Sequence, residues 1–253
     1  MEALPCRASE ASTVKLHDFE VLTFDCYGTL IDWESGLLTA LTPLLAAAAH
    51  TAPGAEVLAQ FATHEVAQQA QTPGMLYPQL LAQVHRRLAR DWGVTVSDAA
   101  HTAFGHSVPQ WPAFADSAAA LQYLKQHYRL VILSNVDRAS FAASNARLRV
   151  SFDAICTAQD IGSYKPDARN FRYLIEAVGR LGVEPRGILH TAQSLYHDHV
   201  PAQAAGLASA WIDRRHEQPG WGATRAPDAT AAYNFRFPSL AQMARAHAAE
   251  AAA

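Results

Sequence analysis

The nine residues Val21–Thr29, with the sequence VLTFDCYGT, decide the fold that we expect. Their first four residues, Val21–Phe24, are apolar or favour β-structure and predict a short buried strand. The strand stops at Asp25, and Gly28 permits a turn in the loop that follows. The stretch therefore predicts a buried strand that delivers a carboxylate into a glycine-containing loop.

Further short apolar runs follow along the chain and alternate with helical patterns. In Phe171–Leu181, apolar residues recur at helical spacing on one face. Strands that alternate with helices indicate βαβ units and a parallel sheet, so we expect an α/β fold with a Rossmann-like core. The predicted strands are Val21–Phe24, Leu130–Leu133, Ala154–Thr157, Gly187–Thr191 and Ala208–Ile212.

The stretch 33–113 differs from the rest, because it contains helical segments but no convincing strand. Its clearest helix is Tyr77–Asp91. We predict an inserted α-helical cap subdomain that lies over the carboxyl ends of the sheet, where open α/β folds bind ligands. The predicted parts are a core (15–32 and 114–240), a cap (33–113) and two flexible ends (1–14 and 241–253).

The composition excludes several classes of protein. Half of the 253 residues are apolar, and the net charge of -3 gives no basic field for nucleic acid. No apolar run is long enough for a membrane helix, and the first residues lack the apolar segment of a signal peptide, so we expect a cytoplasmic protein. Cys6, Cys26 and Cys156 form no C-x-x-C pair, which argues against a disulfide framework or a thiolate metal site.

Four polar segments carry the candidate chemistry, and each ends a predicted strand or starts a loop. Each is a weak signal alone, since Gly-Thr often only turns a chain and Lys-Pro-Asp often only starts a helix. Their order along the chain is the stronger signal. The segments are Asp25–Leu30 (DCYGTL), Ser134–Asn135 (SN), Lys165–Asp167 (KPD) and Ser194–Asp198 (SLYHD).

These residue types suit covalent catalysis by a carboxylate. Asp25 becomes a useful nucleophile when it is held against its target and partly stripped of water. Lys165 supplies a positive charge that keeps Asp25 ionised. Asp198 orients Lys165 and helps to activate water, or it is an ordinary carboxylate at a helix N-terminus. Ser134 and Asn135 can bind a substrate carboxylate or a leaving group.

The order and spacing of the four segments resemble the motifs of the haloacid dehalogenase superfamily, from about Phe19 to Asp213. Phosphatases of that superfamily carry a second aspartate two residues after the nucleophile, where this chain has Tyr27. The phenol, with an unperturbed pKa of about 10, is poorly matched to proton transfer near neutrality. Phosphatases also place an acidic pair in the last motif to hold magnesium, and here Gln193 precedes Ser194.

The L-2-haloacid dehalogenases of the same superfamily carry Asp-x-Tyr-Gly-Thr and need no metal. The resemblance implies that Asp25 displaces halide from C2 of a short 2-haloacid and forms an ester. Water would then attack the Asp25 carbonyl carbon and release a 2-hydroxy acid. The resemblance also implies supporting roles for Thr29, Ser134, Lys165 and Asp198, a halide contact for Asn135, no cofactor, and a homodimer.

This chain departs from the dehalogenase pattern at three positions. The dehalogenases grip the halide with an arginine from an early cap helix, whereas Arg86, Arg87 and Arg90 here lie in a later helix on a solvated face. The family tyrosine after the lysine is Phe171, and the asparagine of the last motif is Leu195. The nucleophile matches the family, and the halide cradle does not.

Histidines are candidates to fill that gap. The early cap helix offers His64 and Glu65, and His64 or His197 could donate hydrogen bonds to a leaving halide or a carboxylate. Each is otherwise an ordinary histidine, as we expect for His190 inside a strand and for His199 at the surface. The spacing of these histidines does not define a metal site, and we predict no metal.

The sequence thus favours a metal-independent hydrolase of short 2-haloalkanoates over two alternatives. The first is a magnesium-dependent phosphatase of the same fold. The second is a scaffold that binds a small carboxylate or a protein, which would need no nucleophile. The candidate catalytic residues are Asp25, Thr29, Lys165 and Asp198, and the candidate substrate-binding residues are Tyr27, His64, Ser134, Asn135, Gln193, Ser194 and His197.

Overall fold

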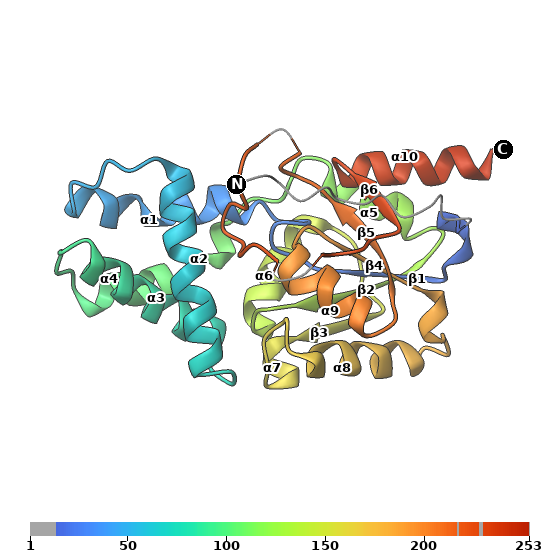
Figure 1. Ribbon diagram of the computed structural model, residues 1–253, viewed down its shortest axis with the longest axis horizontal. Coiled ribbons are helices and arrows are strands. Elements are labelled where there is room, and N and C mark those ends of the chain that lie inside the picture. The colour runs from blue at the N-terminus through green and yellow to red at the C-terminus, as the bar shows by residue number, and fades with distance from the viewer. Residues whose placement is uncertain (1–13, 217, 228–229, 253) are drawn as a thin grey trace.

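A computed structural model describes residues 14–216, 218–227 and 230–252 of the chain. Its central sheet has six parallel strands in the order β3-β2-β1-β4-β5-β6 (Figure 1). The chain builds outward from β1 to β3 on one side and then from β4 to β6 on the other. The strands are β1 (Val21–Phe24), β2 (Arg129–Ser134), β3 (Ala154–Thr157), β4 (Ile188–Ala192), β5 (Ala208–Ile212) and β6 (Phe235–Phe237).

This architecture confirms the predicted α/β fold with a Rossmann-like core. The five predicted strands correspond to β1–β5, with bounds that shift by one residue in places. The sequence did not reveal β6, because it has three residues at the sheet edge and none of them is buried. The direction of the strand order reverses between β1 and β4, and ligands bind at the carboxyl edge of such a switch point.

Alternating side chains of the central strands supply two cores, one on each face of the sheet. On β2, Leu130 and Ile132 pack toward α5 and α10, whereas Val131 and Leu133 pack toward α8. Figure 1 shows α8 along one side of the sheet and α5 and α10 along the other. The helices of the core are α5 (Ser117–Leu124), α6 (Arg138–Leu148), α7 (Ala158–Ile161), α8 (Ala168–Gly179), α9 (Val200–Ala204) and α10 (Leu240–Ala251).

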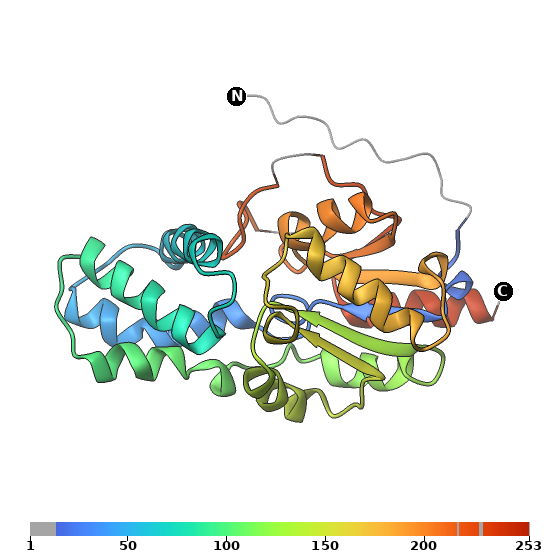
Figure 2. The same ribbon diagram turned by 90° about the horizontal axis from the view of Figure 1, so that it is seen from below.

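The stretch between β1 and α5 forms a group of helices at one end of the molecule (Figures 1 and 2). The predicted helix Tyr77–Asp91 is α3, and its apolar face is buried while Arg86 binds Asp98 and Arg87 binds Gln71 on the outside. This group is the cap, and the structure contains no strand in its described residues. Its helices are α1 (Trp33–Ala47), α2 (Gly54–Gln71), α3 (Tyr77–Asp91) and α4 (Asp98–Gly105).

A glycine of α1 lets the cap pack against the segment that returns to the core. A Cβ atom on Gly36 would lie 2.4 Å from Cγ of Trp111. Trp111 is almost fully buried, and its Nε1 donates a hydrogen bond to Ser107. Its ring also meets the ring of Tyr27 edge-on, with centroids 5.6 Å apart. Gly36 therefore makes room for an indole that joins the cap to the nucleophile loop.

The prediction of a flexible segment at 241–253 is wrong for the residues that the structure describes there. Residues 240–251 form α10, whose Leu240, Met243, Ala244 and His247 are buried. The large buried residues of α10, Leu240, Met243 and His247, stand among many alanines, so the sequence concealed the apolar face. Residues 1–13 of the other predicted flexible end lie outside the described residues. No helix in the described part of the chain is long and apolar enough to span a membrane.

Candidate active site

The loop after β1 holds Asp25 at the carboxyl edge of the sheet. The backbone N–H of Asp25 donates to Thr191 O of β4 (3.1 Å), and two further N–H groups of the loop donate to Cys26 O. Gly28 has a φ of 91°, which disfavours any side chain. A Cβ atom there would also lie 3.0 Å from Nε1 of Trp33. Gly28 therefore permits the turn that brings Asp25 into the site.

Lys165 lies between Asp25 and Asp198. Its Nζ donates to Asp25 Oδ1 (2.9 Å), to Asp198 Oδ1 (2.7 Å) and to Leu133 O (3.0 Å). An ammonium group has three N–H donors, so all of them are used within the protein. The side chain of Lys165 is only 1% exposed. Lys165 thus fixes the two carboxylates and has no hydrogen left to donate to a substrate.

The two carboxylates differ in basicity. Burial raises the pKa of Asp25 above its ordinary value, and the opposing effects of Lys165 and Thr29 do not cancel this rise. Burial also acts on Asp198, but the charge of Lys165 and the contact with His190 outweigh it and hold the pKa of Asp198 well below its usual range. Asp198 is therefore a permanent counter-ion, and Asp25 is the more basic group of the pair.

Two further side chains fix these carboxylates from behind. Thr29 Oγ1 donates to Asp25 Oδ2 (2.7 Å) and accepts a hydrogen bond from the Gln193 backbone N–H (2.9 Å). His190, fully buried on β4, contacts Asp198 Oδ1 through Nε2 (2.9 Å) and Thr23 Oγ1 through Nδ1 (2.8 Å). His190 is satisfied by its neighbours, as expected, but sequence reasoning missed that one neighbour is Asp198.

The cavity beside Asp25 is small, at about 40 Å³, and both core and cap line it. Tyr27 is one of the lining residues, and its hydroxyl forms a hydrogen bond with Ser144 of α6 (2.8 Å). The OH group of Tyr27 therefore serves the core packing, and burial raises its pKa well above the ordinary value. The candidate residues that line this cavity are Asp25, Tyr27, Asn135, Lys165, Ser194, His197 and Asp198.

Three other candidate residues lie near this cavity without lining it. Thr29 lies behind Asp25, and Ser134 is buried at the end of β2 with its hydroxyl unpaired among the described residues. The Gln193 side chain lines an adjoining cavity instead. The structure thus brings ten of the eleven predicted site residues to one edge of the sheet.

The prediction for His64 is wrong. His64 Nε2 lies 2.7 Å from Asp91 Oδ2 on the outer side of the cap, and His64 does not line the cavity. The helix α2 instead turns Glu65 and Gln69 toward Asp25. Successive residues of a helix point in directions about 100° apart. The sequence therefore identified the correct helix but the wrong one of two neighbouring residues.

Two other expectations change in detail. Asn135 accepts a hydrogen bond from Lys165 N (2.7 Å) and donates one to Lys165 O (3.1 Å), so its amide holds the lysine segment in place. His199 was expected at the surface, but it is fully buried and hydrogen-bonds Ser209 and Ala192 O. Asn135 thus supports the site from the cavity wall, and His199 supports it from inside the core.

The cap contributes an acidic group that sequence reasoning did not place. Glu65 is 3% exposed, and Tyr77 of α3 donates a hydrogen bond to its Oε1 (2.8 Å). Burial raises the pKa of Glu65 to about 7, and the bond from Tyr77 opposes this rise. Gln69 lies one turn further along α2 and lines the same cavity.

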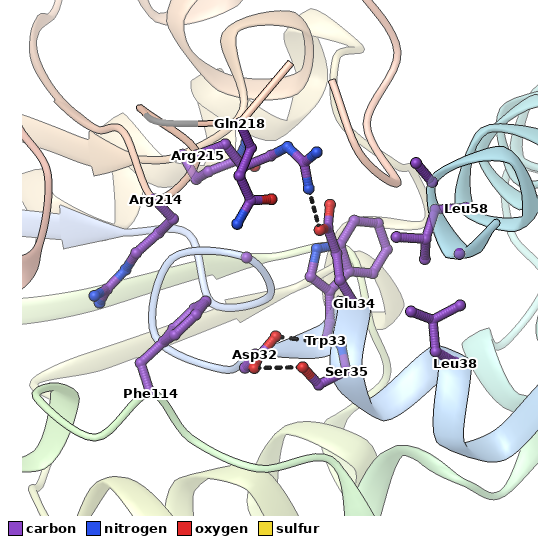
Figure 3. Close-up of a pocket in the computed structure, with 14 residues that line it drawn as sticks. Asp32, Trp33, Glu34, Ser35, Leu38, Leu58, Phe114, Arg214, Arg215 and Gln218 are labelled. Carbon is purple, nitrogen blue, oxygen red and sulfur yellow. Dashed lines mark hydrogen bonds and ion pairs between the residues drawn. The ribbon is translucent and has the colours of Figure 1, made fainter. Parts of the chain in front are cut away.

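A larger cavity of about 360 Å³ adjoins the first one at the junction of core and cap (Figure 3). Trp33 lines both cavities. Arg215 and Glu34 form an ion pair in its wall (2.5 Å). Arg214 donates to Thr29 O (2.8 Å) and pairs with Asp116 (2.8 Å), and so supports the nucleophile loop from outside. No sequence motif pointed to Arg214.

The donor set around Asp25 is organised around an ammonium group. The described residues contain no group of three or more His, Cys, Asp or Glu side chains placed to hold a metal ion. Asp25 and Asp198 instead converge on Lys165 Nζ. This arrangement can keep a carboxylate ionised, fixed and partly dehydrated beside a small cavity, which are the requirements for nucleophilic attack.

Comparisons with known proteins identify relatives of this chain. Residues 19–190 match the family model of haloacid dehalogenase-like hydrolases. A haloacid dehalogenase-like hydrolase domain-containing protein 3 of Mus musculus is 36% identical over 86 residues, which are 34% of this chain and 33% of the mouse protein. An (S)-2-haloacid dehalogenase of Pseudomonas fluorescens is 27% identical over 127 residues, or 49% of this chain and 54% of that protein.

The chain thus spans between a third and about half of the length of these curated relatives. The crystal structure of an L-2-haloacid dehalogenase superimposes with a TM-score of 0.72 at 24% identity, and the match covers 90% of this chain and 98% of the other. At that identity the superposition shows the shared fold. The family model covers well over half of the chain, and the chain therefore belongs to the haloacid dehalogenase-like hydrolases.

Proposed function

We propose that this hydrolase removes halide from short 2-haloalkanoic acids through an ester on Asp25. One observation carries the proposal: Lys165 holds Asp25 and Asp198 beside a small cavity where Tyr27 takes the place of a second carboxylate. A phosphoryl-transfer enzyme of this family needs that second carboxylate as acid and base. Displacement at carbon needs only the nucleophile, since halide leaves as a stable anion.

The reaction has two steps in this proposal. A carboxylate oxygen of Asp25 forms a bond to C2 of the substrate, and the carbon–halogen electron pair leaves with the halide. Water then attacks the carbonyl carbon of the Asp25 ester, and the carbon–oxygen bond between that carbonyl and the substrate breaks. The products are a 2-hydroxy acid, halide and a proton, and Asp25 is regenerated.

The surrounding residues suit these steps. Lys165 and Thr29 direct hydrogen bonds at the two oxygens of Asp25 and so limit their rotation. Asp198 Oδ2 is buried without a hydrogen-bond partner among the described residues, and it can orient the attacking water. The cavity of about 40 Å³ favours small substrates.

The proposal is tested by measuring halide release from chloroacetate, fluoroacetate and L-2-chloropropionate beside phosphate release from an aryl phosphate, each with and without a chelator. We expect halide release that survives chelation. Phosphate release that the chelator abolishes would replace this proposal with a magnesium-dependent phosphatase. A homodimer remains a prediction from the family resemblance.

Two further measurements address the nucleophile. Asp25→Asn should abolish halide release and leave the fold intact, while Asp98→Asn, at an exposed position of the cap, should retain it. A single turnover in heavy-oxygen water should place the label on the Asp25 carboxylate. Label found only in the 2-hydroxy acid would mean that water attacks the substrate directly.

A further inference from the structure

The cavity beside Asp25 has an unfavourable charge balance for a carboxylate substrate. Among the described residues that line it, Lys165 is the only lysine or arginine. Lys165 neutralises one of two aspartates, so an ionised Asp25 leaves one net negative charge on these three groups. All three N–H donors of Lys165 are also in use. A 2-haloalkanoate therefore needs a donor other than Lys165, and the cap side chains that line the cavity are candidates.

Glu65 and Gln69 are placed to supply that donor. They lie four residues apart on α2, which puts them on one face of the helix, and both line the cavity. Glu65 Oε1 accepts the hydrogen bond from Tyr77, and Oε2 has no hydrogen-bond partner in the described part of the chain. Because Oε1 is occupied as an acceptor, a neutral Glu65 carries its proton on Oε2 and has it free to donate.

We propose that Glu65 determines specificity for the substrate carboxylate: the neutral acid donates a hydrogen bond from Oε2 to that carboxylate, and the ionised form repels it. This inference rests on the proposed function, because it takes the substrate to be a small carboxylate. It assigns the binding of the substrate to α2, since no arginine of the cap is among the described residues that line this cavity.

Ionisation of Glu65 falls in the physiological range, since burial raises its pKa to about 7. The tyrosines around it stay neutral, because burial raises the pKa of each one above its ordinary value. Burial lowers the pKa of His197 to about 4, so His197 is neutral as well. The groups that face Glu65 are Tyr77 from α3, Tyr164 beside Lys165, Tyr27 from the nucleophile loop, and Asp25, Lys165, His197 and Asp198 across the cavity.

The sign of the effect follows. Below pH 7 Glu65 is neutral and the carboxylate binds, and above pH 7 affinity should fall about tenfold for each pH unit. The other carboxyl group at this cavity with a raised pKa is Asp25, and its ionisation would also weaken binding of an anion. An experiment must therefore separate Glu65 from Asp25.

Binding of propionate, which carries no halogen and cannot react, makes that separation. We would measure its affinity by calorimetry from pH 6 to pH 9 for the wild-type protein and for Glu65→Gln. The glutamine keeps an acceptor for Tyr77 and a neutral donor at the Oε2 position. We expect the wild-type affinity to fall above pH 7 and that of Glu65→Gln to stay at the wild-type level of pH 6.

A matched control lies on the same helix. Glu56 is exposed at the start of α2, and Glu56→Gln should keep the wild-type pH profile. A fall in affinity that persists in Glu65→Gln would belong to Asp25 and would overturn the proposal. Failure of both proteins to bind propionate at any pH would overturn it too.

A second variant covers the case in which Glu65→Gln does not fold. Tyr77→Phe removes the hydrogen bond that lowers the pKa of Glu65, so the fall in affinity should move to higher pH. A profile that stays in place or moves to lower pH contradicts the proposal. The halide assay tests the proposed function separately. Halide release together with a pH profile of propionate affinity that Glu65→Gln does not change would support the dehalogenase reaction and contradict this inference. Propionate binding that depends on Glu65, without halide release, would support this inference and contradict the dehalogenase reaction.

Discussion

At the scale of single residues, Lys165 is the residue on which the site depends most. Its ammonium group lies between two carboxylates that are almost completely buried, and no other described lysine or arginine lines their cavity. Removing one partner of a buried charge cluster leaves the other charges without compensation, which costs more than the loss of a surface ion pair. Lys165 should therefore matter for folding as well as for turnover.

Replacement of Lys165 by methionine should abolish halide release and lower the free energy of unfolding at pH 7 by about 3–5 kcal/mol. Urea unfolding measures the second effect. Lys125→Met is the matched control, because Lys125 forms a partly exposed pair with Asp153 (2.5 Å) and should cost about 1 kcal/mol or less. The deficit of Lys165→Met should shrink as the pH falls, since protonation neutralises the unpaired aspartates. Equal losses for the two variants would contradict this account.

Sequence reasoning found the residues that belong to contiguous motifs and missed those that reach the site through tertiary packing. Asp25 directly follows β1, Lys165 lies between α7 and α8, and Asp198 lies in the helical turn after β4, so each belongs to a short local motif. His190 and Thr23 face each other on adjacent strands. The sequence signal for their contact was that both are polar residues inside apolar runs. The choice between His64 and Glu65 depends on the rotation of α2 about its axis, which the weak amphipathic pattern of that helix did not fix.

At the scale of helices and strands, the alternation of apolar runs with helical patterns was enough to predict the sheet. Five of the six strands could be found because buried parallel strands form nearly continuous apolar runs. The edge strand β6 could not be found because it is short and unburied, and α10 was missed because its buried Leu240 and Met243 stand among many alanines. The packing of α1 could not be predicted in this way, because it depends on the absence of a side chain at Gly36, next to Trp111.

Gly36→Ala tests that packing. Alanine favours a helix over glycine by about 1 kcal/mol, but its Cβ atom at this position would overlap the ring of Trp111. We expect a net loss of about 1–3 kcal/mol in the free energy of unfolding. Gly179→Ala at the end of α8 provides the comparison, because no atom lies within 4 Å of its Cβ position and it should be neutral or stabilising. Stabilisation by both changes would show that Trp111 moves aside.

At the scale of the whole molecule, buried neutral histidines should make the fold sensitive to acid. Burial lowers the pKa of His199 to about 4, while the same side chain in the unfolded chain takes up a proton near pH 6.5. The unfolded state therefore binds more protons between these two values, and stability falls as the pH falls. His197 contributes in the same direction, since burial lowers its pKa to about 4 as well.

The free energy of unfolding should thus decrease by roughly 3 kcal/mol per fully buried histidine from pH 7 to pH 4. His199→Gln should have a shallower pH dependence in urea unfolding experiments across this range, even where it is less stable at pH 7. His106→Gln, at an exposed position of the cap, should keep the wild-type slope. Parallel slopes for all three proteins would remove His199 as a cause.

The position of Trp33 has a spectroscopic consequence. Trp33 is one of five tryptophans in the chain, and its indole separates the small cavity beside Asp25 from the larger one at the junction of core and cap. It is 7% exposed and meets the ring of Phe61 of α2 edge-on. Any movement of the cap away from the sheet would expose this indole to water and shift its emission to longer wavelength. The protein thus carries an intrinsic fluorophore at the boundary between the two cavities.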